Sequence, residues 1–271
     1  MPTSNLNGVL RQLKKLLRGI TFTAGLFALL ILVEVLIAIP GPDDHFHNPG
    51  RAPVTLGKQL AAGERNRYAV HAAHPLIYVV MGDSTGAGEG GDYKLGIAME
   101  TARSLSTRGP VTMTNLAVSG AKINDVRREQ LTAAEALKPD IVLLAVGAND
   151  GTHFTPRRRI RDGMEAILNG LYSANPRTKV LLTGSPDLGA APRFAQPLRW
   201  LAGTQTERVN AVIVDIARGH GATFVPIADK TGPLFRADPG LYAADRFHPN
   251  NRGYATWFPV LNRALDDTLF R

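Results

Sequence analysis

The fold can be predicted from one stretch of the chain, Pro75-Leu-Ile-Tyr-Val-Val-Met-Gly-Asp-Ser-Thr-Gly-Ala-Gly88. Residues 76–81 form an unbroken apolar run with several β-branched side chains, which is typical of a strand buried on both faces of a parallel sheet. The run ends abruptly in Gly82-Asp83-Ser84, and open α/β sheets bind their ligands at the carboxyl ends of strands. The hydroxyl of Ser84 is therefore the first candidate nucleophile.

Three motifs compete for this stretch, and a glycine-rich turn without function competes with all of them. Gly82-Asp-Ser84-Thr-Gly86 matches the G-x-S-x-G elbow of α/β-hydrolases. Gly86-x-Gly88-x-x-Gly91 matches a dinucleotide-binding fingerprint. The tripeptide Gly82-Asp83-Ser84 alone is the GDS signature of the SGNH, or GDSL, esterases. Each motif is weak alone, so the rest of the chain has to decide between them.

The composition is that of an ordinary globular protein. The chain has 271 residues, of which 44% are hydrophobic and 20% charged. It has no cysteine, which excludes disulfides, thiolate metal sites and cysteine nucleophiles. The net charge of +8 favours anionic surfaces, but no zinc-finger, basic-zipper or RNA-binding motif accompanies it. We therefore expect no nucleic-acid partner.

The amino-terminal region predicts attachment to a membrane. Residues 20–39 are almost continuously apolar, and about 20 such residues span a bilayer as a helix. Four basic residues precede this run and Asp43-Asp44 follow it, so the amino end should stay cytoplasmic and the bulk of the chain extracytoplasmic. A cleaved signal peptide is the alternative, but the apolar run is long and no clear A-x-A site follows it. We therefore expect an uncleaved signal-anchor.

This interpretation divides the chain into four segments. They are a cytoplasmic basic segment at 1–19, a transmembrane helix at 20–39, a juxtamembrane linker at 40–73 and one catalytic domain at 74–271. The linker is assigned because its Pro, Gly, His and charged residues show little periodicity.

Apolar runs alternate with segments of helical periodicity throughout the domain. The runs predict five strands, at residues 76–81, 111–118, 141–146, 179–183 and 223–227. Between and after them, helical periodicity covers residues 95–105, 124–137, 161–172, 201–218 and 254–269. This order predicts a three-layer α/β/α sandwich around a five-stranded parallel sheet. Catalytic groups should then lie in the turns at Ser84, Gly120, Asn149 and Asp187, and in the loop before the last helix.

That last loop contains Asp245-Arg-Phe-His248. An imidazole is a suitable base for a serine hydroxyl because its ordinary pKa lies near neutrality. A carboxylate three residues earlier can accept the Nδ1 proton, which fixes the tautomer and stabilises the imidazolium that forms during attack.

Together, four separated motifs resemble the blocks of the SGNH (GDSL) hydrolase superfamily, in the correct order. They are Gly82-Asp83-Ser84; Gly120 within Asn115-Leu-Ala-Val-Ser-Gly120-Ala121; Gly147-Ala148-Asn149-Asp150; and Asp245-x-x-His248-Pro249-Asn250. The chain departs from the commonest first block in having Thr85 where leucine is usual. The rival motifs lose support, because the second strand ends without the acid that a dinucleotide site needs, and an α/β-hydrolase acid lies far from its histidine.

The resemblance implies a flavodoxin-like fold and a serine esterase that uses neither metal nor cofactor. Ser84 is expected to attack an ester carbonyl, His248 to take its proton and Asp245 to orient the ring. The backbone N–H groups of Ser84 and Gly120 and the side-chain amide of Asn149 are expected to form the oxyanion hole. The substrates would be esters of lipids or O-acetyl groups of envelope glycans. An acyltransferase using the same site and a non-catalytic envelope-binding module are the alternatives.

Two further features stay open in the sequence. A run of arginines, Arg157, Arg158, Arg159 and Arg161, is either a solvated helix start or a site for anionic substrate or lipid head groups. Trp200 either covers an acyl pocket or belongs to the core.

Overall fold

The computed structural model describes residues 25, 54–56 and 75–269. The predicted basic segment and all but Gly25 of the predicted transmembrane helix lie outside the described residues. Within the described part of the chain, none of the helices combines the length and the apolar character that a membrane span requires. The predicted domain limits stay a prediction.

The described residues form one six-stranded mixed sheet, so the prediction of a five-stranded parallel sheet is wrong in number and in kind. All five predicted strands are present and parallel to one another. The sixth strand, β1, lies in the segment assigned to the linker and pairs antiparallel with the outer edge of β3. Across the sheet the order is β1 (Val54–Leu56), β3 (Val111–Asn115), β2 (Leu76–Gly82), β4 (Ile141–Ala145), β5 (Lys179–Leu182) and β6 (Thr223–Phe224).

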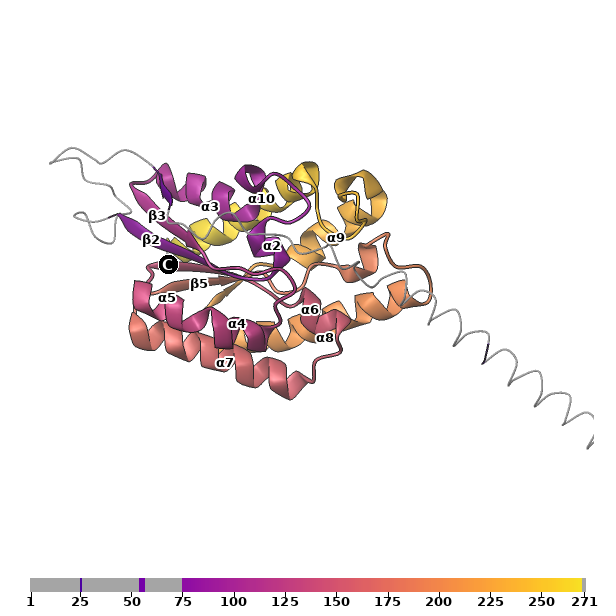
Figure 1. Ribbon diagram of the computed structural model, residues 1–271, viewed down its shortest axis with the longest axis horizontal. Helices are drawn as coiled ribbons and strands as arrows, with labels where there is room; N and C mark the ends of the chain where they lie inside the picture. Colours follow the sequence, from indigo (N-terminus) through magenta and orange to yellow (C-terminus); the bar gives the residue numbers. More distant parts are fainter. Residues whose placement is uncertain (1–24, 26–53, 57–74, 270–271) are drawn as a thin grey trace, which may run out of the picture.

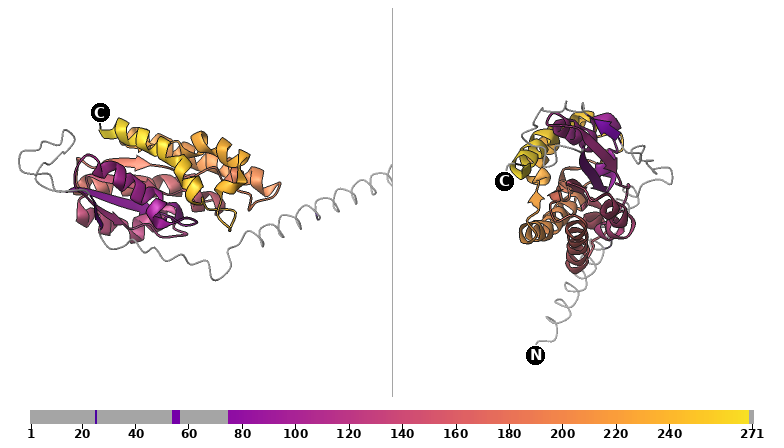
Figure 2. Two further views of the ribbon diagram at one scale, coloured as in Figure 1. Left: turned by 90° about the horizontal axis from the view of Figure 1, so that it is seen from above. Right: turned by 90° about the vertical axis from the view of Figure 1, so that its left-hand side faces the viewer.

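Helices cover both faces of the sheet and make the expected three layers (Figure 1). One layer contains α3 (Ile97–Ser106), α9 (Ile227–Ala237) and α10 (Asn251–Leu269). The other contains α4 (Ile123–Glu129), α5 (Leu131–Leu137), α7 (Arg157–Ala174) and α8 (Leu198–Gly219). The end-on view in Figure 2 shows the sheet between these two layers.

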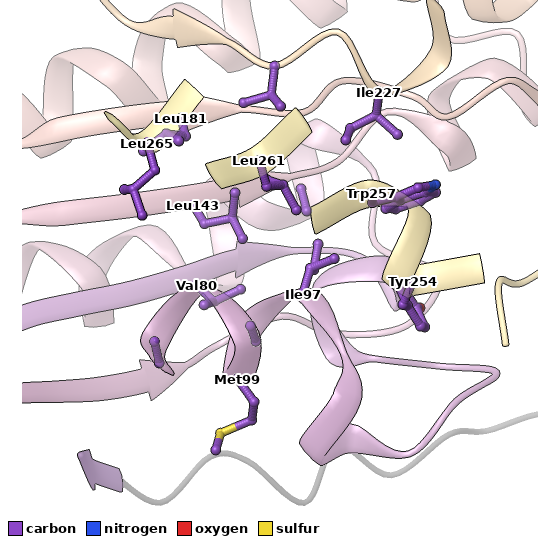
Figure 3. Packing of buried hydrophobic residues seen from close by; sticks show 14 of the residues in the cluster. Val80, Ile97, Met99, Leu143, Leu181, Ile227, Tyr254, Trp257, Leu261 and Leu265 are labelled. Carbon is purple, nitrogen blue, oxygen red and sulfur yellow. The ribbon is translucent and has the colours of Figure 1, made fainter. Parts of the chain in front are cut away.

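Alternating side chains of the strands build two separate cores. In β2, Tyr78 and Val80 pack with the layer that contains α10, whereas Val79 and Met81 pack with the layer that contains α7. All four side chains are fully buried, as a parallel strand covered on both faces requires. Figure 3 shows the first core, where strand residues such as Val80 face the side chains of α10.

Several helices differ from the predicted ones. The single helix expected at residues 124–137 is two helices, α4 and α5. Helix α9 directly follows the last strand and was not predicted, because Thr231-Gly232-Pro233 inside it is typical of a turn. Helix α7 begins at Arg157, so the arginine run forms its first turn. Arg158 and Arg161 pair along the helix with acids four residues later, at 3.6 and 3.7 Å, which agrees with a solvated helix start.

Two short helices follow strands directly at the carboxyl edge of the sheet. Helix α2 (Ser84–Ala87) follows β2, and α6 (Ala148–Thr152) follows β4. Because β2 and β4 are neighbours in the sheet, these two helix starts lie next to each other. The edge therefore gathers the first and third sequence motifs in one place.

Candidate active site

The nucleophile turn depends on a glycine at the end of β2. Gly82 has a φ of +137°, and a Cβ at this position would lie 1.8 Å from the carbonyl oxygen of Ala145. Only glycine fits between the two strands here. The chain turns at this residue, and Ser84 becomes the first residue of α2 with Asp83 as its N-cap. The hydroxyl of Ser84 therefore lies at the edge of the sheet, directly after a buried strand.

Asp83 holds the turn through Thr85. The Oδ1 atom of Asp83 accepts hydrogen bonds from the backbone N–H of Thr85 at 3.0 Å and from its hydroxyl at 2.8 Å. The hydroxyl at this position is the departure from the commonest first block, and it gives the N-cap a second donor. Burial raises the pKa of Asp83 to about 6, although both bonds from Thr85 act in the opposite direction.

A buried side-chain amide completes the end of β2. The Oε1 atom of Gln130 accepts from the N–H of Gly82 at 2.8 Å, and its Nε2 donates to the carbonyl oxygen of Gly82 at 2.8 Å. Strand β3 ends at Asn115, so no strand residue pairs with that N–H, and Gln130 takes the place of the missing partner. Gln130 is only 2% exposed, which places a buried amide, hydrogen-bonded through both its oxygen and its nitrogen, directly behind the turn that carries Ser84.

The histidine loop brings a base to the serine. The Nε2 atom of His248 lies 2.9 Å from the Oγ of Ser84, and its Nδ1 lies 2.5 Å from the Oδ2 of Asp245. The other oxygen of Asp245 accepts from the backbone N–H groups of Phe247 and His248, at 2.9 and 3.0 Å. This arrangement holds a proton on Nδ1 and leaves Nε2 free to accept the serine proton.

The charges around the ring set its pKa. Burial of the ring lowers the pKa of His248, but the hydrogen bond that the ring donates to Asp245 and the charges of Glu89, Asp245 and Asp83 together raise it above the ordinary value. Burial raises the pKa of Asp245, yet the bonds from His248 and from Phe247 outweigh it and bring this pKa to about 2. Asp245 is therefore ionised throughout the neutral range and stabilises the protonated ring.

The predicted oxyanion residues lie on the neighbouring loops. Gly120 has a φ of +81°, and among the described residues no atom beyond its two chain neighbours lies within 4 Å of the position of a Cβ, so its backbone conformation is the reason for glycine here. The side-chain amide of Asn149 donates one hydrogen to the carbonyl oxygen of Ala121, at 3.1 Å. This bond ties the second and third motifs together and leaves the second amide hydrogen of Asn149 for a ligand.

A narrow pocket with a volume of about 30 Å³ lies beside the serine and the histidine. Its walls are mostly apolar and come from several elements: Ala148, Leu188, Ala191, Phe235, Tyr242, Phe247 and Trp257. Asp187, one of the predicted residues at the edge of the sheet, also lines it and pairs with Arg236 at 2.8 Å. Trp200 is 66% exposed and does not belong to the buried core, so Trp257 is the tryptophan of this pocket.

One acidic residue of the site, Glu89, was not predicted from the sequence. Glu89 lies in the glycine-rich loop after α2, and its Oε1 is 3.6 Å from the Nδ1 of His248. Glu89, Asp245 and His248 lie close enough together to share an ion, but both ring nitrogens of His248 already have hydrogen-bond partners. The cluster is thus an imidazole with a carboxylate at 2.5 Å and a second one at 3.6 Å. The acid within the glycine-rich loop was the one signal in the sequence that pointed to Glu89.

The fold and the geometry of the site agree with one family. Residues 80–256 match the model of the GDSL-like Lipase/Acylhydrolase family, and the chain belongs to this family. It is a serine ester hydrolase of the GDSL type.

Similar proteins come from several bacteria. A GDSL-like esterase of Mycobacterium tuberculosis is 29% identical over 76% of this chain and 67% of its own length. The crystal structure of a phospholipase A1 from Streptomyces albidoflavus is 20% identical, with a TM-score of 0.54 over 70% of this chain and 100% of that one. A psychrotrophic esterase of a Pseudoalteromonas species is 18% identical, with a TM-score of 0.55 over 72% and 99%. Both structures are similar to this chain in fold.

Proposed function

We propose that the chain is a membrane-anchored, extracytoplasmic esterase that works through a Ser84–His248–Asp245 triad and an acyl-enzyme. The observation that carries the catalytic part of this proposal is the continuous chain of hydrogen bonds from Ser84 to His248, at 2.9 Å, and on to Asp245, at 2.5 Å. The arrangement is the one in which a serine hydroxyl becomes a nucleophile at neutral pH.

The reaction proceeds in two steps. The Oγ of Ser84 attacks the ester carbonyl carbon while the Nε2 of His248 takes its proton, and the leaving alcohol receives that proton as the C–O bond breaks. A water molecule then attacks the acyl carbon while the Nε2 of His248 takes one of its protons. His248 returns that proton to the Oγ of Ser84 as the ester bond to the serine breaks, and the carboxylic acid leaves. The N–H groups of Ser84 and Gly120 and the free amide hydrogen of Asn149 stabilise the oxyanion in both steps.

The pocket favours a short acyl group. A volume of about 30 Å³ holds two or three groups of the size of a water molecule, which suits an acetyl group, whereas most of an extended fatty-acyl chain would lie outside the pocket. Of the two substrate classes expected from the sequence, O-acetyl esters of envelope glycans therefore fit better than long-chain lipids. The apolar walls would hold the methyl group, and the acetylated sugar would stay outside the pocket.

The test compares wild-type full-length protein in a mild detergent with the Ser84→Ala variant. We expect turnover of p-nitrophenyl acetate that Ser84→Ala abolishes, and a steep decline from acetate through butyrate to a long-chain ester. Turnover that survives in Ser84→Ala would refute the serine mechanism. A preference for the long-chain ester would refute the short acyl group.

The membrane anchor rests on the apolar run at residues 20–39 and has its own test. The full-length protein should stay with the membrane fraction after washing with 1 M salt, because apolar insertion does not depend on ionic screening. Release into the supernatant by salt would refute the anchor.

A further inference from the structure

A second carboxylate faces the catalytic ring from the loop that follows the nucleophile. The Oε1 of Glu89 lies 3.6 Å from the Nδ1 of His248, whereas Asp245 accepts the proton of that nitrogen at 2.5 Å. Nδ1 carries a single proton, which Asp245 already accepts. Glu89 is therefore placed to act on the ring through its charge and not through a hydrogen bond.

The backbone of Glu89 is fixed at both of its polar groups. Its N–H donates to the carbonyl oxygen of Ser84 at 2.9 Å, and its carbonyl oxygen accepts from the hydroxyl of Tyr254 at 2.6 Å. The next residue, Gly90, packs against the histidine loop so closely that a Cβ would lie 2.7 Å from the Cβ of His248. These contacts fix the backbone from which the Glu89 side chain extends to the ring.

The side chain of Glu89 is mostly buried and incompletely paired. It is 16% exposed, and its Oε2 atom has no hydrogen-bond partner among the residues that the structure describes. A buried carboxylate oxygen without a partner costs free energy. A positive charge on the neighbouring ring would offset this cost, and such a charge forms on His248 each time Ser84 gives up its proton.

We propose that Glu89 is a positioning residue which, together with Asp245, stabilises the His248 imidazolium that forms when Ser84 attacks; this role rests on the triad proposed above. Asp245 supplies the hydrogen bond that orients the ring. Glu89 supplies a second negative charge, on the side of the ring that faces the loop after α2.

The ionisable groups around the ring fix the direction of the effect. Three acids face His248: Asp245 from its own loop, Glu89 from the loop after α2, and Asp83 from the start of α2. From α10, the hydroxyl of Tyr254 donates to the backbone carbonyl oxygen of Glu89. All three acids favour the protonated ring, so removing the charge of Glu89 lowers the pKa of His248. For unit charges 3.6 Å apart in a partly buried site, we expect a decrease of about 1 unit or more.

The experiment titrates the ring of His248 by NMR in the full-length protein and in Glu89→Gln, with His248→Gln to assign the signal. Glu89→Gln keeps the size of the side chain and removes its charge. We expect a lower pKa of His248. We also expect the value of kcat/KM at high pH, where it no longer changes with pH, to fall by about 10-fold because kcat falls while KM changes little. Glu129→Gln is the matched control, because Glu129 is 58% exposed on α4, in the opposite helix layer, and should leave both quantities unchanged.

A second variant separates charge from packing. Glu89→Asp keeps the charge on a shorter side chain and should restore part of the pKa of His248, whereas a purely structural role would make both variants equally defective. An unchanged pKa of His248 in Glu89→Gln, within about 0.2 unit, would overturn the proposal. A failure of the proposed triad would give a different result, namely turnover that survives in Ser84→Ala. The two results can be told apart because the titration of the His248 ring does not depend on turnover.

Discussion

The amide of Gln130 offers the sharpest test of how the nucleophile turn is stabilised. In Gln130→Met the side chain keeps about its volume and loses both polar atoms, so the effect of a cavity is small. The N–H of Gly82 then stays buried without a partner, because Gln130 is its acceptor at 2.8 Å. The carbonyl oxygen of Gly82 keeps one of its two donors, the N–H of Val118 at 3.0 Å.

These contacts give a magnitude. An unpaired buried donor costs about 1–3 kcal/mol, and the loss of one of two hydrogen bonds at an acceptor costs about 0.5–1.5 kcal/mol. We therefore expect Gln130→Met to lower the free energy of unfolding by about 1.5–4.5 kcal/mol, a large part of the 5–15 kcal/mol that stabilises a typical domain.

The assay is urea unfolding of the full-length protein, followed by circular dichroism. With an m-value of about 3 kcal/mol/M, the midpoint should fall by about 1 M while m stays constant. The matched control is Gln205→Met. The Oε1 of Gln205 accepts from Arg208 at 3.0 Å on the partly exposed side of α8, so its loss should cost less than about 0.5 kcal/mol. Equal costs for the two variants would refute the reasoning.

Three further predictions concern the chemistry and the turn. Asn149→Ala should lower kcat by about 10²–10³-fold with little change in KM, because one hydrogen-bond donor to the oxyanion is lost. Initial rates measure both constants, and a loss of kcat below about 5-fold would show that Asn149 does not belong to the oxyanion hole. The kcat/KM of the wild type should fall as the pH falls through a value above 6.5, because the raised pKa of His248 leaves the base protonated below it. A profile that stays flat down to pH 6 would contradict this sign. Gly82→Ala should yield no folded protein by circular dichroism, since its Cβ would lie 1.8 Å from the carbonyl oxygen of Ala145.

Local pattern was enough to predict the parallel strands and the position of the main site residues. Each of those strands is an apolar run that ends in a turn, and parallel strands bring such turns to one edge. Ser84 and His248 lie 164 residues apart in sequence, yet this rule predicted that they would meet. Periodicity and the order of the elements were therefore enough to predict that these residues meet at one edge of the sheet.

The features that the sequence did not reveal depend on contacts between distant segments. Strand β1 has only three residues, and nothing in its own pattern distinguishes it from the linker around it. Gln130 is hydrogen-bonded to the backbone of Gly82, 48 positions away in the sequence. Nothing in the sequence around a glutamine between two helices indicates this partner. The position of Glu89 beside His248 depends on how one loop packs against another, which periodicity does not report.

Strand β1 has a consequence for anyone who shortens the chain. A protein cut at the predicted domain start, residue 74, would lack Val54–Leu56 and leave the outer backbone groups of β3 without partners. Such an open edge pairs with the same edge of another molecule and leads to association or precipitation. The removal of Leu56 would also uncover part of the core beneath it. We therefore expect a protein that begins before residue 54 to stay soluble at concentrations at which one that begins at residue 74 associates.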